Sequence, residues 1–279
     1  MILSLSLALM LADPVPVAPT VPAAPVERAP QISLAEAGRA ISAGRLDQAR
    51  AMLSTAIAAG AKGEPVDRLL ADLAMAQGDD AQALVMYRQL LANHPNEELL
   101  LERAGIASLR LGLLPEATSL LDRATRLPDA GWRAWNGRGV AADRQARWDE
   151  ADAAYIRARE LDPARAEVAN NQGWSLMLRG RWADAAAAFE RAATINSNLP
   201  RLANNLELAR TAMAADLPQR LAGESDDDYS ARLNDAGVVA SAAGQTKRAE
   251  AAFAQALEVR SKWYARAADN LAALGAAPR

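Results

Sequence analysis

Asparagine recurs in this chain at a spacing that suits the binding of an extended peptide. The pair Asn170-Asn171 returns 34 residues later as Asn204-Asn205, and single asparagines stand at Asn136 and Asn234. An amide side chain offers both a donor and an acceptor, so a ladder of such groups can clamp a peptide backbone without reading its side chains. The alternative is that some of these amides hydrogen-bond neighbouring helices to one another.

Arginines near these asparagines add a second kind of contact, because a guanidinium group can pair bidentately with a carboxylate. An aromatic side chain among them would serve as an anchor for a partner. We therefore expect the partner-binding set to include Arg103, Arg110, Arg133, Arg144 and Trp174.

Residue types that usually carry catalysis or hold metals are scarce. Cysteine is absent, which excludes disulfides, a thiolate nucleophile and a cysteine zinc site. The one histidine, His94, stands directly before Pro95, where a helix-end residue that caps carbonyl groups is the better interpretation. Asp226-Asp227-Asp228 lacks the spacing of an EF-hand calcium loop, so a solvated loop is expected there. We expect no enzyme activity, no metal and no cofactor.

The elements that must position these side chains follow a fixed period of 34 residues. Small residues recur without insertion or deletion at Ala37, Ala71, Gly105, Gly139 and Gly173. An alanine follows each of them twelve residues later, and a large apolar residue follows sixteen residues later. This period indicates stacked helix–turn–helix units, an architecture that binds partners and rarely does chemistry.

One unit shows why the pattern has a physical meaning. Gly139 lies on the first helix, and Ala151 and Tyr155 lie on the inner face of the second. Small residues let two helix axes approach to roughly 8–10 Å, and Tyr155 fills the wider space beside the crossing. Pro163 ends the second helix, because the residue before a proline is pushed out of the α region.

The sequence resembles the tetratricopeptide repeat (TPR) family. The resemblance rests on Trp135, Gly139, Ala151, Tyr155, Ala158 and Pro163, and again on Gly173, Ala185, Phe189 and Ala192. It implies an all-α fold, a TPR superhelix (α-solenoid) of about six to seven helix–turn–helix repeats. It also implies that the first helix of each unit lines a concave groove, which the asparagines and arginines named above would face.

The register predicts the organisation of the chain. Residues 31–215 hold repeats one to five and the first helix of a sixth, whose second helix is missing after Asp216-Leu217-Pro218. Residues 216–230 read as an irregular linker. Residues 231–279 hold a final unit and a capping helix.

The N-terminal residues have a different character. Residues 1–12 are apolar over the length of a signal-peptide core, although no basic residue precedes the run. Residues 13–30 are rich in proline and are expected to form an extended tether. We expect export to the periplasm or beyond; the alternative is a cytoplasmic protein with a stray apolar start. A net charge of −3 gives no electrostatic case for nucleic acid.

A second resemblance is narrower. Arg147-Trp148-Asp149-Glu150-Ala151 and residues 170–176 are similar to the TadD-like TPR proteins of bacterial Tad (Flp) pilus gene clusters. Members of that group are typically lipoproteins, and this chain has no lipobox cysteine. The resemblance implies a non-catalytic envelope scaffold that binds a protein partner during pilus assembly, with only indirect membrane association. A general periplasmic or cytoplasmic TPR adaptor or co-chaperone is the alternative.

The export hypothesis predicts the behaviour of a fusion. Residues 1–35 joined to a reporter that is active only after export should make the reporter active, because the apolar run has the length of a signal core. Reporter activity in whole cells measures this. An inactive reporter retained in the cytoplasm, after a check of the start codon, would reject the signal.

Overall fold

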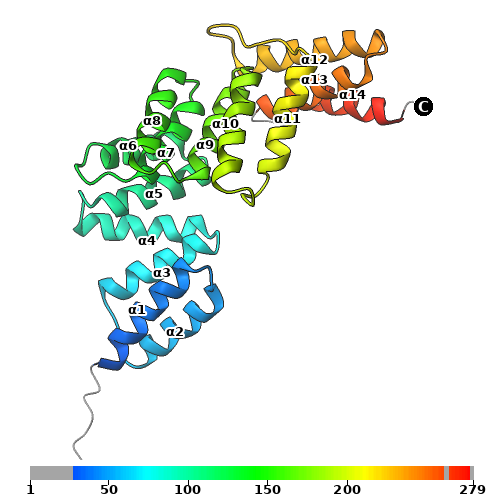
Figure 1. Cartoon of the computed structure of the whole chain (residues 1–279). Coiled ribbons are helices and arrows are strands. Elements are labelled where there is room, and N and C mark those ends of the chain that lie inside the picture. Colours follow the sequence, from blue (N-terminus) through cyan, green and yellow to red (C-terminus); the bar gives the residue numbers. More distant parts are fainter. Residues whose placement is uncertain (1–27, 261–263, 277–279) are drawn as a thin grey trace, which may run out of the picture. The chain divides into compact units, whose positions relative to one another are not determined.

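The computed structural model describes residues 28–260 and 264–276, and every regular element among them is a helix (Figure 1). The chain divides into two compact units, Met1–Lys62 and Gly63–Arg279. The described part of the first unit is a packed helix pair, α1 (Arg28–Ser42) and α2 (Leu46–Ala58).

The second unit continues with further helix pairs. Its helices are α3 (Glu64–Ala76), α4 (Asp80–Asn93), α5 (Glu98–Arg110), α6 (Leu114–Thr125), α7 (Trp132–Asp143), α8 (Trp148–Leu161), α9 (Ala166–Leu178), α10 (Trp182–Ile195), α11 (Leu202–Ala214), α12 (Asp226–Ala242), α13 (Thr246–Val259) and α14 (Ala265–Ala276). Each first helix from α3 to α9 packs on the second helix that follows it. Neighbouring first helices also touch, α5 with α7, α7 with α9 and α9 with α11. The first helices therefore present one common face.

Close approach within each pair depends on the small residue of the period. A Cβ atom on Gly139 would lie 2.7 Å from the ring of Tyr155, and one on Gly105 would lie 2.7 Å from Cγ of Leu121. Both distances are shorter than van der Waals contact, so the glycine and the large side chain opposite it require each other. The predicted helix pairing is confirmed.

The turn within each pair is equally repetitive. Gly78, Gly112 and Gly180 have φ between 71° and 81° there, a left-handed conformation that glycine adopts without a steric cost. Ala146 stands at the equivalent position with φ 52°, so this one turn forces an alanine into a region that side chains disfavour.

Two expected boundaries are wrong. Helix α1 begins at Arg28, so the end of the expected tether over residues 13–30 is helical. Pro30 is tolerated because the first turn of a helix does not need its N–H. The rest of that tether, and the expected signal over residues 1–12, lie outside the described residues.

Helix α12 begins at Asp226, so the irregular linker expected over residues 216–230 ends at Ser225. The Ser225 hydroxyl accepts a hydrogen bond from the backbone N–H of Asp228 at 3.1 Å, which caps the helix. The acidic run expected as a loop is therefore the first turn of α12, where negative charge is favoured by the helix dipole.

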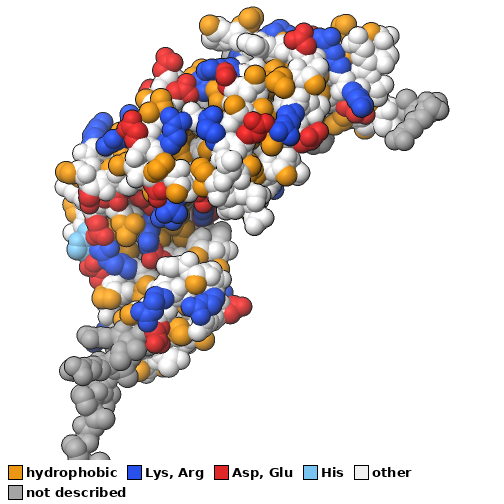
Figure 2. Space-filling view, in the orientation of Figure 1, with side chains coloured by type: hydrophobic (Ala, Val, Ile, Leu, Met, Phe, Trp, Pro, Cys, Tyr) orange, Lys and Arg blue, Asp and Glu red, His pale blue; other side chains and the backbone are white. Residues whose placement is uncertain are grey.

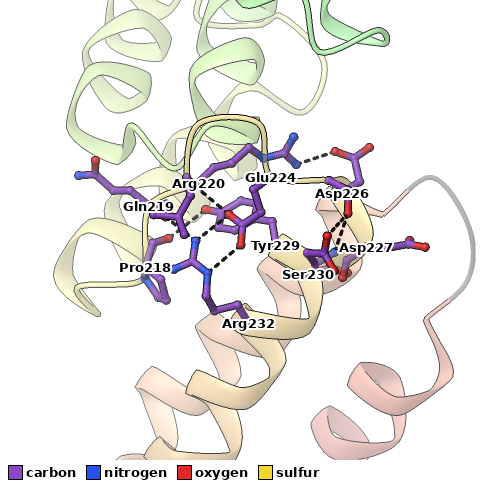
Figure 3. Close-up of polar contacts among 12 residues, drawn as sticks. Pro218, Gln219, Arg220, Glu224, Asp226, Asp227, Tyr229, Ser230 and Arg232 are labelled. Atoms are coloured by element: carbon purple, nitrogen blue, oxygen red, sulfur yellow. Dashed lines mark hydrogen bonds and ion pairs between the residues drawn. The ribbon is translucent and has the colours of Figure 1, made fainter.

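The linker is held by specific contacts rather than free in solvent (Figure 3). The Tyr229 hydroxyl donates to the Pro218 carbonyl at 3.0 Å, and Arg232 donates to the Gln219 carbonyl at 2.6 Å. Arg232 also contacts both carboxylate oxygens of Glu224, at 2.8 and 2.9 Å, and holds the pKa of that carboxyl below its usual range. These bonds fix the start of α12 against the segment that replaces the missing second helix.

The packing predicts the effect of enlarging the small core residues. Ala151 and Ala185 are 0% exposed, so replacing either with leucine should lower the free energy of unfolding by roughly 1–3 kcal/mol through overpacking. Urea denaturation measures this. Ala183, exposed on the same helix as Ala185, supplies the matched control, and an equal loss of stability in Ala183→Leu would contradict the packing argument.

Candidate partner-binding surface

The common face of the first helices carries a row of polar side chains at one register position. In α3, α5, α7 and α9 this position lies three residues before the small residue of the period, and α11 holds its counterpart one period later. We call the set the polar row; its members are Arg68, Glu102, Asn136, Asn170 and Asn204. The row is mostly covered at Glu102, half-buried at Asn136 and Asn170, and exposed at Asn204.

Two members of the polar row are bonded to the next first helix. The Asn171 amide nitrogen of α9 lies 3.1 Å from the Asn136 oxygen of α7. The amides of Asn170 in α9 and Asn205 in α11 lie 2.8 Å apart. Both bonds join residues 35 positions apart, and we call each such bond a rung. The asparagines therefore connect neighbouring repeats, as the alternative interpretation of the sequence allowed.

Trp174 is part of the same contact. With the Asn205 amide turned so that its nitrogen donates to the Arg201 carbonyl at 3.1 Å, its oxygen accepts from Trp174 Nε1 at 3.0 Å. The Trp174 ring meets Phe189 edge-on, with 6.2 Å between ring centroids. The expected aromatic anchor is thus half-buried and supports the contact between α9 and α11.

The remaining two asparagines differ from these. Asn234 of α12, three residues before Gly237, is hydrogen-bonded to Asn270 of α14 at 2.9 Å. This bond joins residues 36 positions apart and is not one of the rungs defined above. Asn204 is exposed, and its side chain makes no hydrogen bond within the described part of the chain.

Three of the four predicted arginines bridge to the repeat before them. Arg103 pairs with Asp72, and Arg110 pairs with Asp80 at 3.1 Å. Arg144 donates to the Leu109 carbonyl at 2.6 Å. Arg133 instead stacks over the Trp132 ring at 4.8 Å and forms no ion pair among the described residues. Of the four, Arg133 has the guanidinium group best placed to accept a new carboxylate partner.

Charge of both signs is mixed over the surface of the second unit. Figure 2 shows basic and acidic side chains lying beside one another on the face in view. Ion pairs account for part of this mixing, such as Arg88 of α4 with Glu116 of α6 at 2.5 Å and Arg179, directly after α9, with Asp152 of α8 at 2.7 Å. Most arginines of this unit therefore have carboxylates close by, whereas Arg133 acts on the Glu102 carboxyl through its charge but forms no ion pair within the described residues.

His94 ends α4, as the sequence indicated, but its ring does not cap a carbonyl. Its Nε2 lies 2.7 Å from a carboxylate oxygen of Glu64, and Arg68 contacts the same carboxylate. The His94 contact, and then that of Arg68, hold the pKa of Glu64 below its usual range. The histidine is a structural link at the start of α3.

Glu102 was not singled out by the sequence, yet it is the most unusual member of the polar row. Glu102 is only 6% exposed. Burial, and then the nearby Glu98 carboxyl, raise the pKa of Glu102 to about 7 against the opposing effect of Arg133. The signal that could have revealed it is its register, 34 residues before Asn136.

Asp143 is a second buried carboxyl that sequence reasoning missed. It accepts hydrogen bonds from the Tyr155 hydroxyl at 2.7 Å and from the Ser175 hydroxyl at 2.6 Å. Burial raises the pKa of Asp143 to about 6, although both hydrogen bonds act in the opposite direction. Because its partners come from α8 and α9, Asp143 links two repeats and has a structural explanation.

Metal-binding and membrane-spanning features are missing from the described ranges. No cluster of three or more histidine, aspartate or glutamate side chains there could hold a metal ion. None of the helices described has the length and apolar character needed to cross a membrane.

Comparison with known proteins places the repeats in a family. A family model described as tetratricopeptide repeat matches residues 68–131, 103–151 and 136–200. The crystal structure of TTC0263, a thermophilic TPR protein of Thermus thermophilus, is similar with a TM-score of 0.57 and 21% identity, over 65% of this chain and 99% of that one. PilW, titled a widely conserved type IV pilus biogenesis factor, is similar with a TM-score of 0.53 and 18% identity, over 88% of this chain and 98% of that one. At these identities the likeness shows the fold.

One curated relative is similar in sequence. Cellulose synthase 2 operon protein C of Komagataeibacter xylinus is 38% identical over 92 residues. The match covers 33% of this chain and 7% of the relative's length. The match therefore concerns a short stretch of repeats within a much longer protein.

Glu102 predicts how stability depends on pH. A carboxyl whose pKa is raised in the folded state stabilises the fold below its unfolded pKa, and this stability is lost as pH rises through the folded pKa. The free energy of unfolding should therefore fall between about pH 4.5 and pH 8, by a few kcal/mol at most from this residue.

The matched variant is Glu102→Gln, which cannot ionise. It should equal the parent in stability at pH 4.5 and exceed it at pH 8, as measured by urea denaturation at both values. A variant less stable than the parent at pH 8 would show that the ionised carboxyl is well accommodated.

Proposed function

Since the chain is a tetratricopeptide repeat protein, we propose that it is a non-catalytic scaffold that binds a protein segment along the first-helix face of α5, α7, α9 and α11. Proteins of this family are generally interaction scaffolds. The observation that carries the proposal is the polar row, which presents a polar side chain at the same position of consecutive first helices that touch one another. A row at fixed intervals suits an extended segment whose backbone groups also recur at fixed intervals.

The predicted binding residues then divide by what they touch. Asn204 and Arg133 are exposed, and their side chains form no hydrogen bond or ion pair in the described part of the chain, so they are proposed to contact the segment directly. Asn136 and Asn170 each use one side of the amide in a rung and have hydrogen-bonding capacity left. Asn171, Asn205, Arg103, Arg110 and Arg144 are proposed to hold the face in shape.

We further propose that the scaffold works in the bacterial envelope, in the assembly of a pilus or secretion system. The support is the resemblance of residues 135–217 to the TadD-like group and the apolar start that suits export. The fold shared with PilW is compatible with this placement. A periplasmic location follows from the same proposal.

The alternative is a general TPR adaptor or co-chaperone unrelated to pili. Gene neighbourhood separates the two: prepilin, secretin and secretion-ATPase genes beside this one favour the pilus function. Their absence from the neighbourhood in related genomes favours the adaptor.

Site-specific photo-crosslinking tests the proposed surface. A photoreactive amino acid at Arg133 or at Asn204, both exposed, should crosslink to the same protein in intact cells, because one bound segment would pass both positions. Mass spectrometry of the crosslinked bands identifies the partner.

Positions on the second helices supply the control. Ala153 of α8 and Ala187 of α10 are exposed, and the same photoreactive residue there should not capture that partner. Crosslinks from Ala153 and Ala187 but not from Arg133 and Asn204 would place the binding surface on the second-helix face.

A further inference from the structure

Two rungs join neighbouring first helices of the polar row, and Glu102 takes part in no such bond. Asn136 is bonded to residue 171 and Asn170 to residue 205, in each case 35 positions further on. The member of the polar row one repeat earlier is Glu102. The residue 35 positions after Glu102 is Gly137, which has no side chain. The rung between α5 and α7 therefore lacks its second half.

Packing explains why the second half is missing. A Cβ atom on Gly137 would lie 3.0 Å from Cδ2 of Leu121 and 3.3 Å from its Cδ1. These distances are tighter than ordinary contact, so the approach of α7 to Leu121 of α6 favours glycine at this position. Position 137 therefore supplies no donor to Glu102.

No other described group replaces that donor. Glu102 forms no hydrogen bond or ion pair within the described residues. The Gly131 N–H donates to Glu98 at 3.2 Å. Arg133 acts on Glu102 through its charge, but forms no hydrogen bond or ion pair with it. Glu98 itself carries the same charge and opposes ionisation of Glu102.

The carboxyl group still meets the surface. The fully enclosed polar side-chain atoms without a partner belong to Ser108, Arg147, Arg220, Gln255 and Arg260 in the described part of the chain. The Glu102 oxygens are not among them, so the small exposed part of this residue includes its carboxyl end. The Glu102 carboxyl is therefore nearly buried but can be reached from outside.

We propose that Glu102, whose carboxyl end lies near Gly131 at the start of α7, is the anchor point for a lysine or arginine side chain of the segment bound on the first-helix face. The inference rests on the proposed function and deepens it by naming a chemical feature of the partner. In the two rungs, two amide side chains of this chain are bonded to each other. At Glu102, the bonding group is a basic side chain of the partner.

A basic group is the occupant that the charges favour. A carboxylate pairs with a cation through hydrogen bonds about twice as strong as those between neutral groups. Leaving an ionised group nearly buried without a partner is costly, and a cation removes that cost. The raised pKa of Glu102, about 7, reports the cost in the free protein. An arriving cation lowers that pKa, so binding releases a proton at neutral pH and weakens in acid.

The test uses the full chain and two small probes. Nα-acetyl-arginine amide is cationic, and Nα-acetyl-citrulline amide has nearly the same shape but no charge. Each is titrated while carbon-13 NMR follows the Glu102 carboxyl signal, which is assigned by its absence in Glu102→Gln. At pH 8 the arginine probe should bind about tenfold tighter than the citrulline probe, as expected for a hydrogen bond to a charged group. Its affinity should fall at least about tenfold at pH 5.5, where Glu102 is protonated.

The control variant is Glu167→Gln, which removes an exposed carboxylate from α9. It should leave the affinity for the arginine probe unchanged, whereas Glu102→Gln should abolish the preference over citrulline. Equal binding of the two probes, no saturable shift at Glu102, or a preference that survives in Glu102→Gln would each overturn the inference.

This outcome is separable from that of the proposed function. If a partner crosslinks at Arg133 and Asn204 but the arginine probe binds independently of Glu102, only the proposed basic anchor is rejected. A Glu102-dependent arginine preference in a protein whose crosslinks map to the second helices would keep the anchor site and reject the first-helix face as the scaffold surface.

Discussion

The contact between a small residue on each first helix and a large side chain on the second fixes the rest of the array. Phe189 lies where a Cβ atom on Gly173 would have to be, and Phe253 does the same to Gly237. The pair can approach only at that point, so the axial position of the second helix relative to the first is set. Since each unit repeats the contact at the same place, residues one period apart come to equivalent positions on neighbouring helices. The polar row is a consequence of this register.

The same register limits how polar groups on the first-helix face can be satisfied. A half-buried amide must find a partner, because an unmade hydrogen bond costs about 1–3 kcal/mol. Asn136 and Asn170 meet this need with Asn171 and Asn205 of the following repeat. Each rung therefore contributes about 1 kcal/mol to holding neighbouring repeats in register, and the apolar contacts below it supply most of the free energy of packing. The buried Asp143 carboxyl likewise accepts hydrogen bonds, from the hydroxyl groups of Tyr155 in α8 and Ser175 in α9.

The sequence predicts the contacts within one helix pair, which depend only on the 34-residue period. It does not predict the bonds between neighbouring repeats, which depend on how far one first helix is displaced along the next. Gly139 and Tyr155 face each other within one helix pair whatever the neighbouring repeat does, so their pairing could be predicted. The bond from Asn136 to Asn171 requires α9 to be displaced by one residue relative to α7, and no pattern within one repeat encodes that displacement. The start of α12 was missed for a related reason. A serine followed by three aspartates fits a polar loop as well as a capped first turn, and only the contacts of α12 with the linker select the helix.

A side chain that closes a rung inside the array has less to offer a partner, so binding capacity concentrates where the repeat is imperfect. Arg133 is freed because it stacks on a tryptophan ring rather than pairing with a carboxylate. Asn204 is freed because its repeat has no second helix and is followed by the linker to α12. Glu102 is left open because position 137, 35 residues further on, is a glycine that packs closely against Leu121. Regular repeats supply the geometry, and departures from regularity supply the groups that can recognise another chain. The physical basis for specificity in such a scaffold is thus the set of positions where its own hydrogen-bonding pattern is incomplete.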